Sequence, residues 1–83
     1  MSAADATARA IAALAQALDL PLDKVSPDSR FAEDLGVDSL DFLQLVMAVE
    51  EATGLRLDDK AAAAARSVGE LLALVRQARQ DAG

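Results

Sequence analysis

A single serine stands at the start of an apolar segment and between two carboxylates, in the stretch Asp-Leu-Gly-Val-Asp-Ser-Leu-Asp over residues 34–41. The sequence contains no histidine and no cysteine, so Ser39 lacks the usual general bases that would activate its hydroxyl as a nucleophile. Lys24 and Lys60 are the remaining side chains that could take that part. These residue types favour a serine that another protein modifies, and we do not expect an enzyme with catalytic residues of its own.

The helix that positions Ser39 is predicted to begin at Asp38 or Ser39 and to end near Thr53, with Gly54 at its C-terminal stop. We favour Asp38 as the N-cap, because Asp41 then falls at the third helical position in a weaker relative of the capping box. Ser39 would then be the first helical residue, with its hydroxyl free and directed outward.

The same helix carries more apolar residues than one buried stripe needs. They fill seven of the ten positions from 40 to 49, namely Leu40, Phe42, Leu43, Leu45, Val46, Met47 and Val49. Two interpretations stay open. Either this is a central helix packed on both sides, or part of it forms an exposed apolar patch of the kind that marks interaction sites. Such a patch would be ringed by four acids, Asp38, Asp41, Glu50 and Glu51.

Residues 5–18 have the apolar spacing of an amphipathic helix, for which Ser2 or Asp5 could provide the cap. Pro21 should end this helix near Leu20. A long loop follows, in which residues 28–34 could form a single helical turn. Its apolar anchors are expected to be Val25, Phe31 and Leu35.

Two more helices are predicted after Gly54. Lys60 and the five alanines that follow it indicate a short third helix, Lys60 to Arg66. Ser67-Val68-Gly69-Glu70 matches the capping box and opens a last helix that should fray after about Arg79. Its core stripe is expected to be Val68, Leu71, Leu72 and Val75. The fold class is therefore all-α, a small bundle of three main helices and a short third one, in a single domain over residues 1–83.

The amino-acid composition restricts the kinds of molecule that could bind this chain. The net charge is −6, and residues 1–59 hold 12 acids and 4 bases. Nucleic acid is an unsuitable partner for such a surface, whereas a basic protein surface complements it. The carboxylates lack the spacing of a calcium loop, so we expect no metal site. No apolar run approaches a membrane span and no signal peptide is recognisable, so we expect a soluble cytoplasmic protein.

Residues 31–40, which contain Asp38-Ser39-Leu40, resemble the loop and the Asp-Ser-Leu signature of the acyl carrier protein family. Residues 45–51 resemble the continuation of the family's second helix, through which its members are recognised. The layout agrees from about residue 8 to 78. The resemblance implies a four-helix bundle and a monomer.

The resemblance further implies that a separate, magnesium-dependent phosphopantetheinyl transferase esterifies Ser39 with 4′-phosphopantetheine. The thiol of this group would carry acyl intermediates as thioesters for enzymes of fatty acid or polyketide-type biosynthesis that have basic docking patches. By position, the family's partner-binding acids correspond to Asp38, Asp41, Glu50 and Glu51, and its apolar contacts to Leu40 and Met47.

The sequence also departs from the family pattern. Gln44 stands where fatty-acid carriers usually have an acid, and the third helix is rich in alanine, with Ala65 at the site of a larger aliphatic residue. These departures suggest a specialised pathway. Two alternatives stay open: a peptidyl or D-alanyl carrier, and a helical interaction subunit that is never modified. Gly36-Val37-Asp38 before the serine favours acyl over peptidyl cargo.

Overall fold

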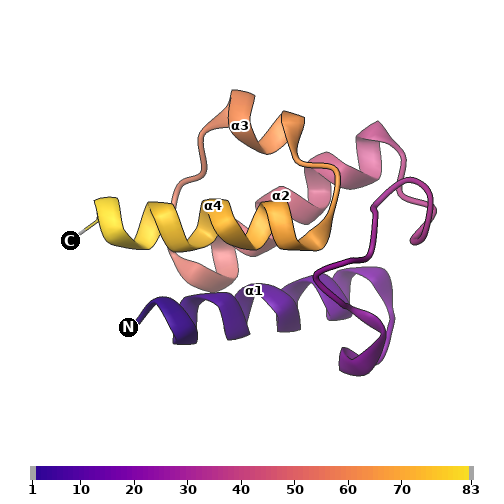
Figure 1. The fold of residues 1–83 in the computed structure, drawn as a ribbon, viewed down its shortest axis with the longest axis horizontal. Coiled ribbons are helices and arrows are strands. Elements are labelled where there is room, and N and C mark those ends of the chain that lie inside the picture. Colours follow the sequence, from indigo (N-terminus) through magenta and orange to yellow (C-terminus); the bar gives the residue numbers. More distant parts are fainter. Residues whose placement is uncertain (1, 83) are drawn as a thin grey trace.

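The computed structural model describes residues 2–82, which contain four α-helices and one 3₁₀ turn joined by loops (Figure 1). The helices are α1 (Ala3–Leu18), α2 (Ser39–Thr53), α3 (Asp59–Ala64) and α4 (Val68–Asp81), and the 3₁₀ turn is η1 (Leu22–Lys24). The predicted small helical bundle with a short third helix is confirmed.

The sequence left two candidates for the N-cap of helix α1, Ser2 and Asp5. The hydroxyl of Ser2 accepts a hydrogen bond from the backbone N–H of Asp5 over 3.1 Å, and the Asp5 carboxylate accepts one from the N–H of Ser2 over 3.5 Å. Ser2 is therefore the N-cap and Asp5 completes the capping box. The buried face of α1 contains Ala6, Ala10, Leu14 and Ala15. Because three of these are alanine, the neighbouring helices can approach α1 closely.

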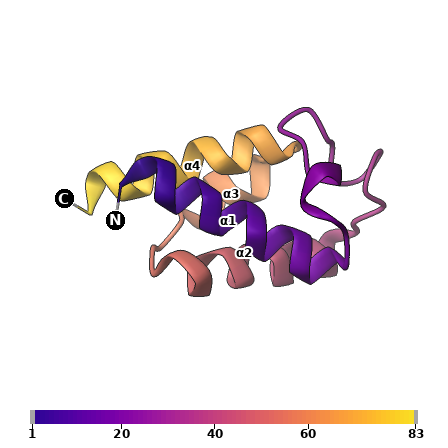
Figure 2. The ribbon, with the colours of Figure 1, turned by 90° about the horizontal axis from the view of Figure 1, so that it is seen from below.

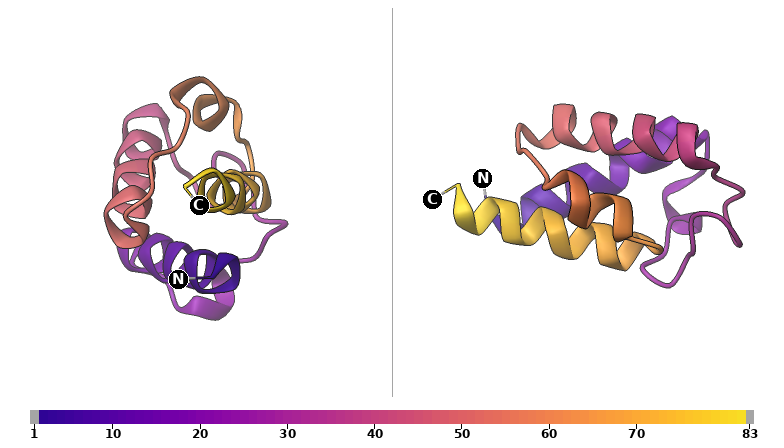
Figure 3. Two further views of the ribbon diagram at one scale, coloured as in Figure 1. Left: turned by 90° about the vertical axis from the view of Figure 1, so that its left-hand side faces the viewer. Right: turned by 90° about the horizontal axis from the view of Figure 1, so that it is seen from above.

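The core lies between α1, α2 and α4. Figures 2 and 3 show α1 beside both of the other long helices, and α3 spans α2 and α4 on the side away from α1. The largest fully buried side chains are Leu14, Val49, Val68, Leu71 and Val75. The predicted stripe of α4 is confirmed, because all four of its residues are buried.

The loop between α1 and α2 is tied to the start of α4. The N–H of Phe31 donates to the carbonyl of Arg66 over 3.0 Å, and the N–H of Val68 donates to the carbonyl of Ser29 over 2.9 Å. Val25 and Phe31 are buried and Leu35 is half-buried, as the sequence predicted.

The single helical turn expected over residues 28–34 is confirmed only in part, as an isolated hydrogen-bonded turn that begins at Arg30. Arg30 pairs with Ser67 in an isolated antiparallel bridge, which holds the backbone extended at that point. Hydrogen-bonded turns follow, with the N–H groups of Asp34 and Leu35 both donating to the carbonyl of Arg30. The helical residues of this loop are instead Leu22–Lys24.

Helices α3 and α4 also differ slightly from their predicted bounds. Asp58 caps α3 through a hydrogen bond from the Ala61 N–H to its carboxylate over 2.9 Å, so α3 begins at Asp59, one residue earlier than expected. It also ends earlier, at Ala64, because the backbone of Ala65 is extended. The predicted capping box of α4 is present, with Ser67 and Glu70 as its partners. Helix α4 continues to Asp81, beyond the point where fraying was expected. In residues 2–82 no helix has the length and apolarity needed to cross a membrane.

Candidate functional site

Ser39 is the first residue of α2, and its side chain is exposed. Asp38 is the N-cap, with extended backbone angles, and its Oδ1 accepts a hydrogen bond from the N–H of Asp41 over 2.8 Å. The preferred cap assignment is therefore confirmed. Among residues 2–82, none forms a hydrogen bond with the Ser39 hydroxyl, and the residue is exposed to solvent.

The segment that leads to Ser39 is fixed. Gly36 has a φ of 65°, in the left-handed region that glycine adopts without a steric penalty. Val37 follows with its side chain buried, and its N–H donates to the carbonyl of Phe31 over 2.8 Å. The chain is thus anchored to the core two residues before Ser39, which fixes the direction in which the backbone enters α2.

Ser39 also lines a groove of about 860 Å³ between α2, α3 and the loop before α2. Apart from Ser39 and Asp38, the groove is lined by Phe31, Ala32, Glu33, Val37, Phe42, Leu43, Val46, Asp59 and residues 62–66. The rings of Phe31 and Phe42 pack edge to face, with centroids 5.0 Å apart. The lining is therefore apolar in the main, with a few charged residues among the apolar ones.

The charged lining of this groove is mostly acidic, with Glu33, Asp38 and Asp59 against Arg66. Glu33 forms an ion pair with Arg30 over 3.0 Å, and this contact raises the pKa of Arg30. Both side chains are well exposed, so the pair contributes little to stability. The groove thus offers apolar surface beside a hydroxyl, with an acidic rim.

The apolar residues of α2 divide between two environments. Leu45, Val46 and Val49 are buried and Phe42 is half-buried. Leu40, Leu43 and Met47 are 73%, 61% and 55% exposed. Both interpretations of this helix were therefore partly right, because it packs by one set of apolar residues and exposes another.

The exposed residues Leu40, Leu43 and Met47, here called the α2 patch, follow one another at spacings of three and four. Such spacings place side chains on one face of a helix. Leu43 was missing from the predicted partner-binding residues. The signal that could have identified it is this spacing, since Leu43 falls between the two patch residues that were predicted.

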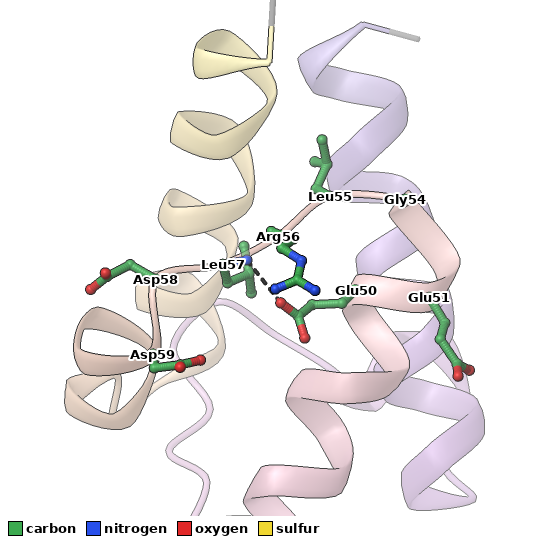
Figure 4. Close-up of a pocket in the computed structure, with 8 residues that line it drawn as sticks. All are labelled: Glu50, Glu51, Gly54, Leu55, Arg56, Leu57, Asp58 and Asp59. Atoms are coloured by element: carbon green, nitrogen blue, oxygen red, sulfur yellow. Dashed lines mark hydrogen bonds between the residues drawn. The ribbon is translucent and has the colours of Figure 1, made fainter.

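The four predicted docking acids are not equivalent. Asp38, Asp41 and Glu51 are exposed. Asp38 and Asp41 lie at the start of α2, beside Leu40 of the α2 patch, and Glu51 lies near the end of the helix. Glu50, in contrast, is half-buried. The Oε2 atom of Glu50 accepts a hydrogen bond from the N–H of Leu57 over 2.9 Å (Figure 4). In the described residues, 2–82, no group of three or more acids could hold a metal ion.

Comparison with known proteins gives evidence that does not depend on the structure. A family model described as "Phosphopantetheine attachment site" matches residues 8–75. The protein named acyl carrier protein 3 from Ralstonia nicotianae is 36% identical over 70 residues, which cover 84% of this chain and 80% of that protein. A protein named acyl carrier protein from a Sulfurovum species is 43% identical over 58 residues, which cover 70% of this chain and 77% of that protein.

Proposed function

Because this chain belongs to the acyl carrier protein family, whose members bear a covalently attached phosphopantetheine group, we propose that Ser39 is its attachment residue. When bound, this group supplies a thiol on a long arm, to which acyl cargo is joined as a thioester. The single observation that carries the proposal is the exposed Ser39 hydroxyl at the capped start of α2.

The residues around Ser39 fit a phosphate ester at this place. The carboxylate of Asp38 is engaged with the N–H of Asp41, so it serves the helix while the Ser39 hydroxyl remains open. A phosphate at the first position of α2 would lie in the favourable field of the helix N-terminus. The groove beside Ser39 provides apolar surface along which an arm or the start of an acyl chain could lie.

No side chain of residues 2–82 forms a hydrogen bond with the Ser39 hydroxyl, so in this proposal a partner enzyme carries out the attachment. In the proposed reaction, the Ser39 oxygen attacks the β-phosphorus of coenzyme A and the pyrophosphate bond breaks. Adenosine 3′,5′-bisphosphate leaves, and a base of the transferase takes the hydroxyl proton. This chain contributes the accessible hydroxyl and the rigid helix start that presents it.

We further propose that partner enzymes dock on the α2 patch and the acids around it. The three apolar side chains can be buried against a partner, while Asp38, Asp41 and Glu51 face a basic surface. The partners are then the transferase and the acyl-handling enzymes of fatty acid or polyketide-type biosynthesis. A carrier that docks with several enzymes in turn benefits from a thiol on a tether, because tethering raises its effective concentration at each active site.

Intact mass tests this function. The purified chain is incubated with a phosphopantetheinyl transferase and coenzyme A, alongside a known carrier as positive control. We expect the mass to rise by one phosphopantetheine group in the wild type and in Ser29→Ala, and to stay unchanged in Ser39→Ala. An unmodified wild type beside a modified control would favour the unmodified interaction subunit instead.

A further inference from the structure

Adjacent acids at the end of α2 lie in different surroundings, although the sequence predicts one role for both. Glu50 is half-buried, and its Oε2 accepts a hydrogen bond from the N–H of Leu57 over 2.9 Å. Glu51 is exposed, and Figure 4 shows its side chain pointing away from the connection between α2 and α3. The carboxylate of Glu50 is therefore directed at the chain itself.

In the connection to α3, residues 54–58, the N–H of Gly54 pairs with the backbone carbonyl of Glu50, and two further amides pair with side chains. The N–H of Leu55 donates to the hydroxyl of buried Thr53 over 3.3 Å, and the N–H of Leu57 donates to Glu50. Leu55 and Leu57 are only 8% and 6% exposed. Because amides in such surroundings require a partner, Glu50 satisfies a donor that water does not readily reach.

Helix α3 follows directly and has little to hold it in place. It has six residues, DKAAAA, and a helix this short is not stable without tertiary support. Its four alanines bury little area, and Ala62 is the buried residue among them. The position of α3 must therefore be set largely by the segments at its two ends.

Both ends of α3 are tied to the rest of the molecule by hydrogen bonds. After α3, the carbonyl of Arg66 accepts from the N–H of Phe31 in the loop before α2. Before α3, the bond from Leu57 to Glu50 joins the connection to the last turns of α2. Asp58, the next residue, is the N-cap of α3, so a shift at Leu57 is passed directly to the start of this helix.

One side of the groove beside Ser39 consists of α3 and the residues that follow it. We propose that Glu50 is a positioning residue, which fixes the start of α3 through Leu57 and so sets the shape of this groove. The inference rests on the proposed function, because the groove matters through its place beside the attachment residue. It assigns to Glu50 a role inside the carrier that differs from the docking role of Glu51.

Two substitutions at position 50 separate the effect of the hydrogen-bond acceptor of Glu50 from the effect of its charge. Glu50→Gln keeps a side-chain oxygen that can accept from the Leu57 N–H but removes the charge. Glu50→Ala removes both. Glu51→Ala is the matched control, since it removes an adjacent carboxylate that is exposed and does not face the connection.

The test is amide hydrogen exchange by nuclear magnetic resonance on the full chain without its prosthetic group. In Glu50→Ala we expect exchange at Leu57, Ala61 and Ala62 to be about tenfold faster than in the wild type, as follows from loss of a hydrogen bond to a charged acceptor. Glu50→Gln should stay closer to the wild type, and Glu51→Ala should match it. Amides in the middle of α4 should be unchanged in all three, which separates local opening from global unfolding.

A second measurement covers the case in which these amides exchange too fast to compare. The methyl resonances of the groove alanines, Ala62–Ala65, should shift in Glu50→Ala and not in Glu51→Ala. Wild-type exchange and wild-type methyl positions in Glu50→Ala would overturn the proposal, as would a Glu50→Gln variant as perturbed as Glu50→Ala. Failure of Ser39 loading would leave these results untouched, because they are measured on the unloaded chain.

Discussion

At the scale of single residues, the start of α2 has a carboxylate and a hydroxyl side by side with separate tasks. Asp38 pairs with the N–H of Asp41, while the adjacent Ser39 hydroxyl is left open. The same helix start therefore combines a capped end with an exposed hydroxyl that forms no hydrogen bond with residues 2–82. The modification proposed for Ser39 would therefore leave the cap hydrogen bond of Asp38 in place.

The cap can be tested apart from its charge. Asp38→Ala should lower the free energy of unfolding by about 1 kcal/mol, because the Asp41 N–H loses its acceptor. Asp38→Asn should cost only a few tenths of that, since asparagine caps a helix about as well as aspartate. Urea unfolding of the three proteins provides the comparison. Equal losses in both variants would show that the charge of Asp38, and not its cap hydrogen bond, stabilises α2.

The sequence predicted those residue roles that depend on neighbours along the chain. Asp38 and Gly54 were identified as the boundaries of α2 because caps and left-handed stops are local signals. The role of Glu50 could not be predicted, because the N–H of Leu57 reaches its carboxylate only when the connection folds back over α2. By charge alone, Glu50 and Glu51 are indistinguishable.

At the scale of elements, helix α2 packs into the core with one set of apolar side chains and exposes another set to solvent. Two leucines on this helix provide a matched pair, with Leu45 at 3% and Leu43 at 61% exposed. Leu45→Ala should destabilise the chain by about 2–5 kcal/mol, whereas Leu43→Ala should change stability by about 0.5 kcal/mol or less. Leu43→Ala should instead weaken binding to a partner enzyme. A similar loss of stability in both variants, measured by urea unfolding, would contradict the division of α2 into two faces.

Where the first loop packs against α4, we predict the opposite of what helix propensity alone would give. Gly69 lies in the first turn of α4, where alanine is ordinarily preferred by about 1 kcal/mol. A Cβ at this position would lie 2.9 Å from the carbonyl oxygen of Pro27, which also accepts the N–H of Gly69. Gly69→Ala should therefore destabilise the chain, by about 1–3 kcal/mol, as overpacking does. An increase in thermal stability would show that the loop moves aside at no cost.

The turn before α2 and helix α3 were both predicted inexactly, for different reasons. Residues 28–34 contain an isolated turn that begins at Arg30, and its start is extended because Arg30 pairs with Ser67 at the beginning of α4. The bounds of α3 shifted because Asp58, which the sequence did not identify as a cap, holds its first turn. In contrast, the capping box at Ser67 involves residues three positions apart and was predicted directly, whereas at the first helix the sequence left Ser2 and Asp5 open as caps.

At the scale of the whole molecule, charge is unevenly distributed along the chain. The net charge is −6, while residues 60–83 contain 2 acids and 4 bases. The excess of acids therefore lies in the first part of the chain, which includes α2 and the loop before it. A basic partner should be drawn to this part at long range, and such attraction is screened by salt.

Salt dependence tests whether the position of charge or its total governs docking. The kcat/KM for loading by a phosphopantetheinyl transferase should fall as ionic strength rises, and Asp41→Asn should make that fall shallower. Asp81→Asn removes the same amount of charge at the end of α4 and should leave the salt dependence unchanged. Identical behaviour of the two variants would mean that net charge alone governs the encounter.

The most direct measurement of the central claim is the position of the modification within the loaded chain. Wild-type protein loaded with coenzyme A and a transferase is digested, and tandem mass spectrometry locates the added group. The proposed function predicts phosphopantetheine on Ser39, in the peptide that contains residues 34–41, with the other serines unmodified. A group located on any residue other than Ser39, with Ser39 itself unmodified, would contradict the account.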